Sequence, residues 1–376
     1  MSISICVFAN TIGFPAGGLI WEYLNWVLGL RALGCKVTWL EAVGPGMPDE
    51  EMIAVLKVRL ERYGLAESVA LCSRTGDAIP REALAGCLSL EEVSELDLLI
   101  NMAYSTPPKL IQRFRRSMFV DVDPGLTQIW MGEGGGLNVG PHDIYFTIGE
   151  TVGRPGALFP DLGFDWHYTP PCVALEWWPR CEGIAPGAAF TTISQWYADE
   201  WVDYAGELYS NNKREGFLPF LDLPRHTCQP LELALCLAPE EDDDERAVLK
   251  ERGWRLREAH TVSSTPWEYQ AYIQSSLGEF SCAKPSCIRL QNAWVSDRTI
   301  CYLASGKPAI VQHTGPSGFL PDAAGLFRFS NLEEARCYLE RAMSDYGRQC
   351  KLARGLAEEY FDAKKNLKRV LEKALP

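Results

Sequence analysis

Several signals of common protein classes are missing from this 376-residue sequence. Basic residues are the minority charge, with 36 Lys and Arg against 49 Asp and Glu, which gives a formal net charge of −13. This balance argues against a nucleic-acid partner and an anionic membrane surface, although a local basic pocket for one small anion remains allowed. No apolar run approaches the roughly 20 residues of a membrane span, so we expect no transmembrane segment.

Signals for metal binding and for several kinds of hydrolase are missing as well. The 13 cysteines include no C-x-x-C pair, and the five histidines show no metal-ligand spacing, so we predict no metal site. No G-x-S-x-G, P-loop or HExxH motif occurs. An odd number of scattered thiols indicates a reducing compartment, and the first ten residues lack the positive start of a signal peptide. We therefore expect a cytoplasmic protein.

Apolar segments of strand length alternate with helical segments along the whole chain. This alternation predicts the α/β class, with parallel sheets covered by helices on both faces. Two series of strands predict two domains, residues 1–185 and 186–360, and the amphipathic helix at 361–376 is expected to pack back on the first. The predicted strands are 3–8, 36–42, 97–102, 117–122 and 143–148, then 190–194, 232–238, 254–259, 278–282, 307–312 and 325–330.

The segment WVSDRTICYLASGKPAIVQHTG, residues 294–315, predicts one helix–strand unit. Ser296 suits the N-cap of a helix, and Gly306 suits its end in the left-handed conformation. Arg298 lies in the first turn, where free amides and the helix dipole favour a phosphate. Lys284 precedes this helix by about a dozen residues, and the two cations together predict a clamp for a diphosphate. Taken singly, each cation would be an ordinary solvated side chain.

Other polar residues of the same region are candidates for the same ligand. Asp297 would accept hydrogen bonds from sugar hydroxyls, or would only favour the helix start. His313, Thr314 and Gly315 form the small polar loop after the strand, and His313 is the one histidine that we place at a site.

The amino-terminal third of the chain offers a second group of candidates. Gly17 and Gly18 stand just before an apolar helix, where they allow close approach of a ligand or simply make a tight turn. Asp121 and Asp123 follow an apolar strand, so they would act as a general base, hold a divalent cation, or cap the turn at Pro124. Glu150 also follows a strand and would act as a base, or as a cap or ion-pair partner.

Two segments together are similar to a known family. GEFSCAKPSC followed by WVSDRTICYLASGKPAIVQHTG, together with GLIWEYLNWVLGLRALGCKVTWLE, resembles glycosyltransferases of the GT-B fold. The likeness looks closest to the bacterial branch related to spore-coat glycosyltransferase-like proteins, and it extends over most of the chain. It implies two Rossmann-like domains that face a central cleft, with an acceptor in the first domain and a nucleotide-sugar donor in the second.

The resemblance also implies a reaction. A sugar would pass from the donor to an acceptor nucleophile without a metal, and Lys284, Arg298 and the amides at 296–298 would stabilise the diphosphate leaving group. Asp123, Asp121 or Glu150 would deprotonate the acceptor, which the sequence does not identify. No separate cofactor is implied. The chain departs from the family at Cys301, where many members carry a glutamate that holds the ribose.

Two other functions fit the same residues. A sugar-nucleotide epimerase would keep the diphosphate clamp and need no acceptor. A non-catalytic nucleotide-sugar-binding protein would bind the same ligand without turnover.

Overall fold

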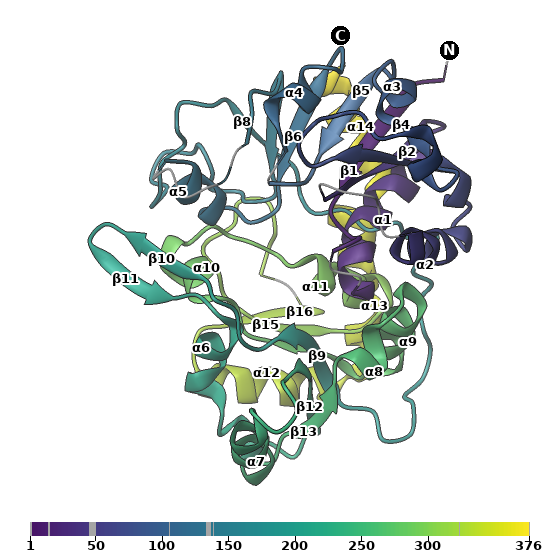
Figure 1. Ribbon diagram of the computed structural model, residues 1–376. Coiled ribbons are helices and arrows are strands. Elements are labelled where there is room, and N and C mark those ends of the chain that lie inside the picture. The colour runs from purple at the N-terminus through teal and green to yellow at the C-terminus, as the bar shows by residue number, and fades with distance from the viewer. Residues whose placement is uncertain are drawn as a thin grey trace. The chain divides into compact units, whose positions relative to one another are not determined.

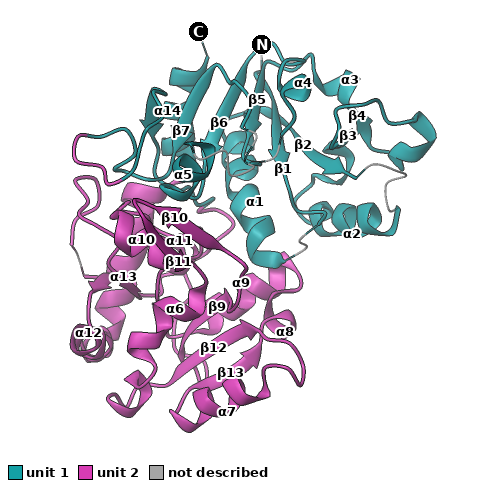
Figure 2. Cartoon of the chain, turned by 60° about the vertical axis from the view of Figure 1, so that its left-hand side comes forward, with its two compact units in different colours: residues 1–154, 159–174, 363–376 teal, residues 155–158, 175–362 magenta. Residues whose placement is uncertain are grey.

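The computed structural model describes residues 2–13, 16–44, 50–104, 106–132, 137, 139–322 and 324–375 (Figure 1). The chain divides into two compact units, which Figure 2 colours separately. Unit 1 comprises residues 1–154, 159–174 and 363–376, and unit 2 comprises residues 155–158 and 175–362. Apart from residues 155–158, unit 2 begins at residue 175, ahead of the expected boundary at 185/186, and the final helix of the chain belongs to unit 1.

Unit 1 is built on one sheet of eight strands in the order β4-β3-β2-β1-β5-β6-β7-β8. All neighbouring pairs are parallel, so the carboxyl ends of the strands lie along one edge. The strand order reverses beside β1, which has β2 on one side and β5 on the other. The strands are β1 Ser4–Ala9, β2 Lys36–Val43, β3 Val69–Ser73, β4 Leu88–Ser89, β5 Leu98–Asn101, β6 Ser117–Asp121, β7 Ile144–Thr147 and β8 Trp166–Tyr168.

The helices of unit 1 include α14, which comes from the far end of the chain and packs on α1 (Figure 1). A Cβ at Gly29 would meet the Cβ of Ala363 at 2.6 Å, so the close crossing of the two helices requires glycine there. Leu367, Val370 and Leu371 form the buried stripe of α14. The helices are α1 Gly17–Ala32, α2 Glu50–Glu61, α3 Leu90–Val93, α4 Pro108–Ile111, α5 Leu126–Gly132 and α14 Ala363–Ala374.

Unit 2 has a second, smaller sheet of six parallel strands in the order β13-β12-β9-β14-β15-β16. Its order reverses between β9 and β14. A separate antiparallel hairpin, β10 with β11, projects from this unit (Figure 1). The strands are β9 Phe190–Gln195, β10 Trp201–Tyr204, β11 Glu207–Ser210, β12 Leu231–Cys236, β13 Arg255–Glu258, β14 Gly278–Ser281, β15 Ala309–Gln312 and β16 Leu326–Phe329.

Aromatic packing supports the sheet of unit 2. The rings of Phe280 on β14 and Phe329 on β16 are stacked with centroids 5.3 Å apart, and Trp254 lies against Phe280 at 5.9 Å. The helices are α6 Lys213–Phe217, α7 Asp243–Glu251, α8 His260–Ser263, α9 Pro266–Ser275, α10 Pro285–Leu290, α11 Asp297–Ala304, α12 Leu332–Ser344 and α13 Tyr346–Leu356, which continues as a π-helical turn over Ala357–Phe361.

The predicted α/β class with two parallel sheets is confirmed. Each of the eleven predicted strands overlaps an observed one, whereas the short strands β3, β4 and β8 and the hairpin were not predicted. Phe14 and Pro15, shortly before α1, and Asp49, just before α2, lie outside the described residues.

Candidate functional site

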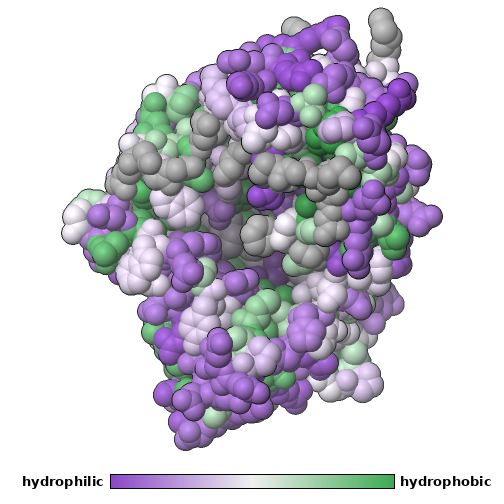
Figure 3. Space-filling model, in the orientation of Figure 1, coloured by the Kyte–Doolittle hydropathy of each residue, from purple (hydrophilic) through white to green (hydrophobic). Residues whose placement is uncertain are grey.

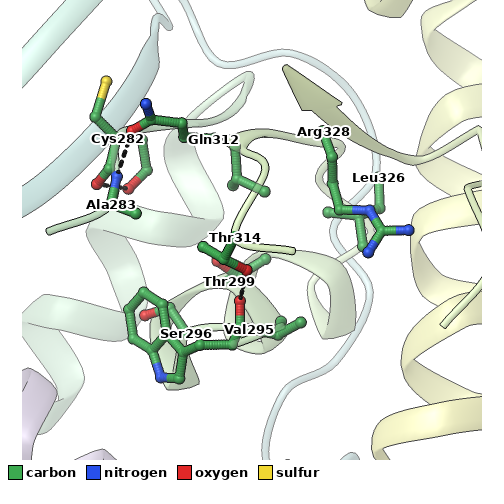
Figure 4. Close-up of a pocket in the computed structure, with 12 residues that line it drawn as sticks. Cys282, Ala283, Val295, Ser296, Thr299, Gln312, Thr314, Leu326 and Arg328 are labelled. Carbon is green, nitrogen blue, oxygen red and sulfur yellow. Dashed lines mark hydrogen bonds between the residues drawn. The ribbon is translucent and has the colours of Figure 1, made fainter. Parts of the chain in front are cut away.

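A hollow opens in unit 2 at the carboxyl ends of β14 and β15, beside the point where the strand order reverses. Ligands of open α/β sheets bind at this place. The hollow is shallow: its volume is about 20 Å³, or about 380 Å³ when the open space at its mouth is counted. Figure 4 shows Ala283 and Gln312 on one side, joined by a hydrogen bond, and Leu326 and Arg328 on the other. Ser281, Cys282, Trp294, Val295, Ser296, Thr299, Val311 and Thr314 complete the lining.

Helix α11 begins at this hollow in the way that its sequence predicts. The Ser296 hydroxyl accepts a hydrogen bond from the Arg298 amide at 3.2 Å, so Ser296 is the N-cap. Gly306 ends the helix with φ of +71°, and β15 follows from Ala309. The first turn therefore presents backbone amides and the positive end of the helix dipole at one wall of the hollow.

The guanidinium of Arg298 points into the unit and does not stand free at the helix start. Its Nε donates to the Glu279 carboxylate at 2.9 Å, and its two terminal nitrogens donate to the Ile193 carbonyl at 2.8 Å and the Ser281 hydroxyl at 2.6 Å. Glu279 is fully buried, and its proximity raises the pKa of Arg298 against the effect of burial. Arg298 thus ties α11 to β9 and β14, and a contact with phosphate would have to replace these bonds.

Lys284, the other predicted cation, lies after β14 and forms an ion pair. Its ammonium donates to both carboxylate oxygens of Glu200, at 2.8 and 2.7 Å. Glu200 stands at the base of the β10–β11 hairpin and also accepts a hydrogen bond from the Asn211 amide side chain at 3.1 Å. The pair is partly exposed, so a stronger anion can compete for the lysine.

A third cation, Lys213, belongs to the same group and was missed by the sequence reasoning. Its Nζ donates to the Cys282 carbonyl at 2.9 Å and lies 5.4 Å from the centre of the Trp294 ring, and both residues line the hollow. Burial, together with the positive charges of Arg298 and Lys284, lowers the pKa of Lys213 to about 8. No carboxylate among the described residues lies within 4.0 Å of Lys213.

A sequence signal for Lys213 did exist. It is the first residue of α6, after the N-cap Asn212, and a cation at that end of a helix opposes the helix dipole. A residue that conflicts with its local structure is a candidate for a functional role. Helix α6 also packs directly on the chain after β14, because a Cβ at Gly216 would meet the Ala283 carbonyl oxygen at 2.0 Å.

The remaining predicted residues of this region lie around the same strand ends. Thr314 lines the hollow and donates to the Trp294 carbonyl at 2.7 Å. His313 accepts a hydrogen bond from the Gly315 amide at 3.1 Å, and burial lowers its pKa. Asp297 is partly exposed in the first turn of α11, and burial raises its pKa in spite of the neighbouring Arg298. Their predicted roles toward a ligand stay predictions.

Unit 1 holds the predicted carboxylates at the ends of β6 and β7. Asp121 has no exposed surface, and burial raises its pKa to about 6. It accepts hydrogen bonds from the side chains of Thr127, Gln128 and Thr147 at 2.6 to 2.9 Å. These contacts give Asp121 a part in holding the ends of β6, β7 and α5 together, and they leave it closed to solvent.

Asp123 and Glu150 differ from Asp121 because both are partly exposed. Asp123 accepts a hydrogen bond from the Tyr104 hydroxyl at 3.2 Å. A partly exposed carboxylate at the carboxyl end of a parallel sheet can take a proton from a bound hydroxyl, whereas a closed one cannot. Which of these carboxylates is a base stays a prediction.

Gly17 and Gly18 form the start of α1, also in unit 1. Ala16 is the N-cap and has no side-chain cap, so the first amides of this helix are not satisfied by a capping side chain. The glycines therefore lie in a different unit from Lys284 and α11. Their predicted contact with a ligand stays a prediction.

The described residues offer neither a metal-binding cluster nor a membrane-spanning helix. Within the described ranges, no group of three or more His, Cys, Asp or Glu side chains is arranged to hold a metal ion. None of the described helices has the length and apolarity needed to cross a bilayer. Polar residues cover most of the described surface on the face in Figure 3, and apolar residues are scattered among them.

The chain is similar to several solved structures. No protein-family model matches it, and no curated protein does. Among solved structures, an alpha-glucosyltransferase in complex with UDP and a 13-mer DNA matches with a TM-score of 0.58 at 11% identity, over 99% of both chains. Anabaena Alr3699/HepE in complex with UDP-glucose gives the same TM-score, identity and coverage.

A glycosyltransferase from Rickettsia africae matches with a TM-score of 0.52 at 8% identity, over 99% of this chain and 98% of its own. At such low identities the likeness concerns the fold. This chain therefore has the two-sheet α/β fold of these glycosyltransferases, the GT-B fold.

Proposed function

We propose that this protein is a glycosyltransferase that moves a sugar from a nucleotide-sugar, of the UDP type, to an acceptor nucleophile. One observation carries the proposal: Lys213 contacts two residues of a hollow that the first turn of α11 also lines, on the carboxyl edge of a parallel sheet, and Lys284 lies close to Lys213. We propose UDP as the nucleotide of the donor because structural neighbours of this chain were solved with UDP or UDP-glucose. The narrower likeness to the spore-coat branch remains part of the proposal.

The charge of Lys213 supports an anionic ligand. Its pKa is lowered because the charged form has lost water and faces other cations, so an anion placed beside it would restore a favourable environment. A diphosphate supplies that charge and also accepts hydrogen bonds from the α11 amides. Lys284 would exchange Glu200 for the same group. In this proposal Arg298 does not contact the diphosphate but holds the first turn of α11 against β9 and β14.

The same groups would serve the chemical step. Negative charge develops on the diphosphate as the bond to the anomeric carbon breaks, and fixed donors stabilise it most when they are already in place. Two lysines and a helix terminus would supply this stabilisation without a metal. Unit 1 would receive the acceptor, and Asp123 or Glu150 would take the proton from its nucleophilic group.

The test is incubation of the purified protein with UDP-glucose, UDP-galactose and UDP-N-acetylglucosamine, followed by chromatography of nucleotides and sugars. A glycosyltransferase releases UDP and free sugar slowly from its own donor, because water replaces the missing acceptor. An epimerase would convert one nucleotide-sugar into its isomer and release no UDP. A non-catalytic binding protein would leave all three unchanged, and either of these last two results would contradict the proposal.

A further inference from the structure

A second hollow lies in unit 1, between the loop that follows β1 and helix α2. Its volume is about 240 Å³, or about 590 Å³ when the open space at its mouth is counted. The smaller figure lies somewhat below the roughly 300–1,000 Å³ of drug-sized ligand pockets, so the hollow suits a small ligand. The hollow lies next to β1, where the strand order of this sheet reverses. It thus occupies in unit 1 the kind of place that ligands take in open α/β sheets.

The loop after β1, which lines one side of this hollow, is held by a buried carboxylate, that of Glu41 near the end of β2. Glu41 has no exposed surface, and burial raises its pKa. Its oxygens accept hydrogen bonds from the Thr11 amide at 3.0 Å, the Ile12 amide at 3.3 Å and the Trp39 indole at 2.9 Å. The Thr11 hydroxyl also donates to it. The loop that carries Thr11 and Ile12 is therefore fixed in advance of any ligand.

The wall of the hollow is the apolar side of α2. Leu56 is buried at the back, while Met52 and Val55 line the hollow with 38% and 42% of their surfaces exposed. Glu51 and Arg59 also line it; they are eight residues apart, about 12 Å along a helix, and opposite in charge. Exposed apolar side chains around a concave site favour an apolar ligand, and lining charges of both signs favour one without net charge.

We propose that this hollow binds the acceptor, and that the acceptor is a neutral small molecule with an apolar body and a hydroxyl group. The statement that the ligand is an acceptor rests on the proposed function, whereas the statement that the hollow binds a neutral, largely apolar molecule does not. A free sugar would need many hydrogen-bonding partners, whereas four of the seven lining side chains are apolar and the Thr11 hydroxyl already donates to Glu41. A polyanion would need an excess of cations.

The chain offers a matched pair of variants. Val55 lines the hollow, and Val58 lies on the same helix with 61% of its surface exposed but outside the lining. Val55→Trp fills the hollow, and Val58→Trp adds the same side chain elsewhere on α2. Both valines are exposed, so neither change disturbs a packed core, and equal thermal midpoints for the three proteins check this.

Equilibrium dialysis with 1-naphthol and 1-octanol, and with glucose as the polar probe, measures the binding. We expect at least one of the two alcohols to bind the wild-type protein better than glucose, with affinity reduced 10-fold or more in Val55→Trp and unchanged in Val58→Trp. Any of three results overturns the inference: neither alcohol binds the wild-type protein, glucose binds it with the same affinity as the alcohols, or Val55→Trp and Val58→Trp have the same affinity for the alcohols.

Isothermal titration with UDP separates this inference from the proposed function. UDP affinity should be the same in all three proteins, because the donor residues lie in unit 2. Binding of an alcohol without any binding of UDP would contradict the proposed function and leave the site in unit 1 standing. Binding of UDP with no alcohol effect at Val55 would do the reverse.

Discussion

Replacing Arg298 by alanine distinguishes a supporting role from a contact with phosphate. The change removes three hydrogen bonds and leaves Glu279, which is fully buried, without its ion-pair partner. Breaking a buried pair in this way costs about 3–5 kcal/mol. For a domain of this size, about 2–4 °C is lost per kcal/mol, so the midpoint of unfolding of unit 2 should fall by roughly 6–20 °C.

The double variant Arg298→Met with Glu279→Met provides the control. It removes both charges and leaves no carboxylate unpaired, so much of the lost stability should return. Differential scanning calorimetry measures the midpoints, and titration with UDP measures binding by the folded proteins. The reasoning is refuted if Arg298→Ala unfolds at the wild-type temperature and loses UDP affinity tenfold or more, since the guanidinium would then act on the ligand and not on the fold.

Three further predictions concern the other carboxylates. Asp123→Asn or Glu150→Gln should leave UDP affinity nearly unchanged, and at least one should reduce turnover by ~10²–10⁴-fold; normal turnover in both would remove these residues from the mechanism. Glu200→Gln should strengthen UDP binding in calorimetric titration, because the carboxylate competes with the diphosphate for Lys284; weaker binding would mean that Glu200 only positions the lysine. Burial raises the pKa of Asp121 to about 6, so its folded state favours the protonated form, and its contribution is complete below its ordinary pKa and lost as pH rises through 6. Urea unfolding should show the stability of the wild type falling relative to Asp121→Asn by about 2 kcal/mol between pH 4 and pH 7, and a pH-independent difference would contradict the argument.

Local features of the fold were predictable from sequence, because the residues that determine them are neighbours in the chain. Ser296 and Gly306 marked the two ends of α11. Strand β3, Val69–Ser73, was missed because its four apolar residues and one serine show no clear period and fit a helix equally well.

The direction of side chains in the site was not predictable in the same way. Arg298 was correctly placed in the first turn of α11, but its partners Glu279 and Ile193 are 19 and 105 residues away in the chain. Lys213 is 69 residues from the Cys282 carbonyl that it contacts. Such contacts depend on the tertiary fold, and periodicity along the chain carries no information about them.

Isothermal titration of the wild type and Lys213→Ala with UDP and with uridine tests the central claim most directly. A charge-assisted hydrogen bond contributes on the order of 1.5–3 kcal/mol, so Lys213→Ala should weaken UDP binding by roughly 10- to 100-fold. Uridine lacks the diphosphate, and its affinity should be the same for both proteins. Failure of the wild type to bind UDP, or an equal loss for UDP and uridine, would contradict a diphosphate site at Lys213 and the strand ends of unit 2.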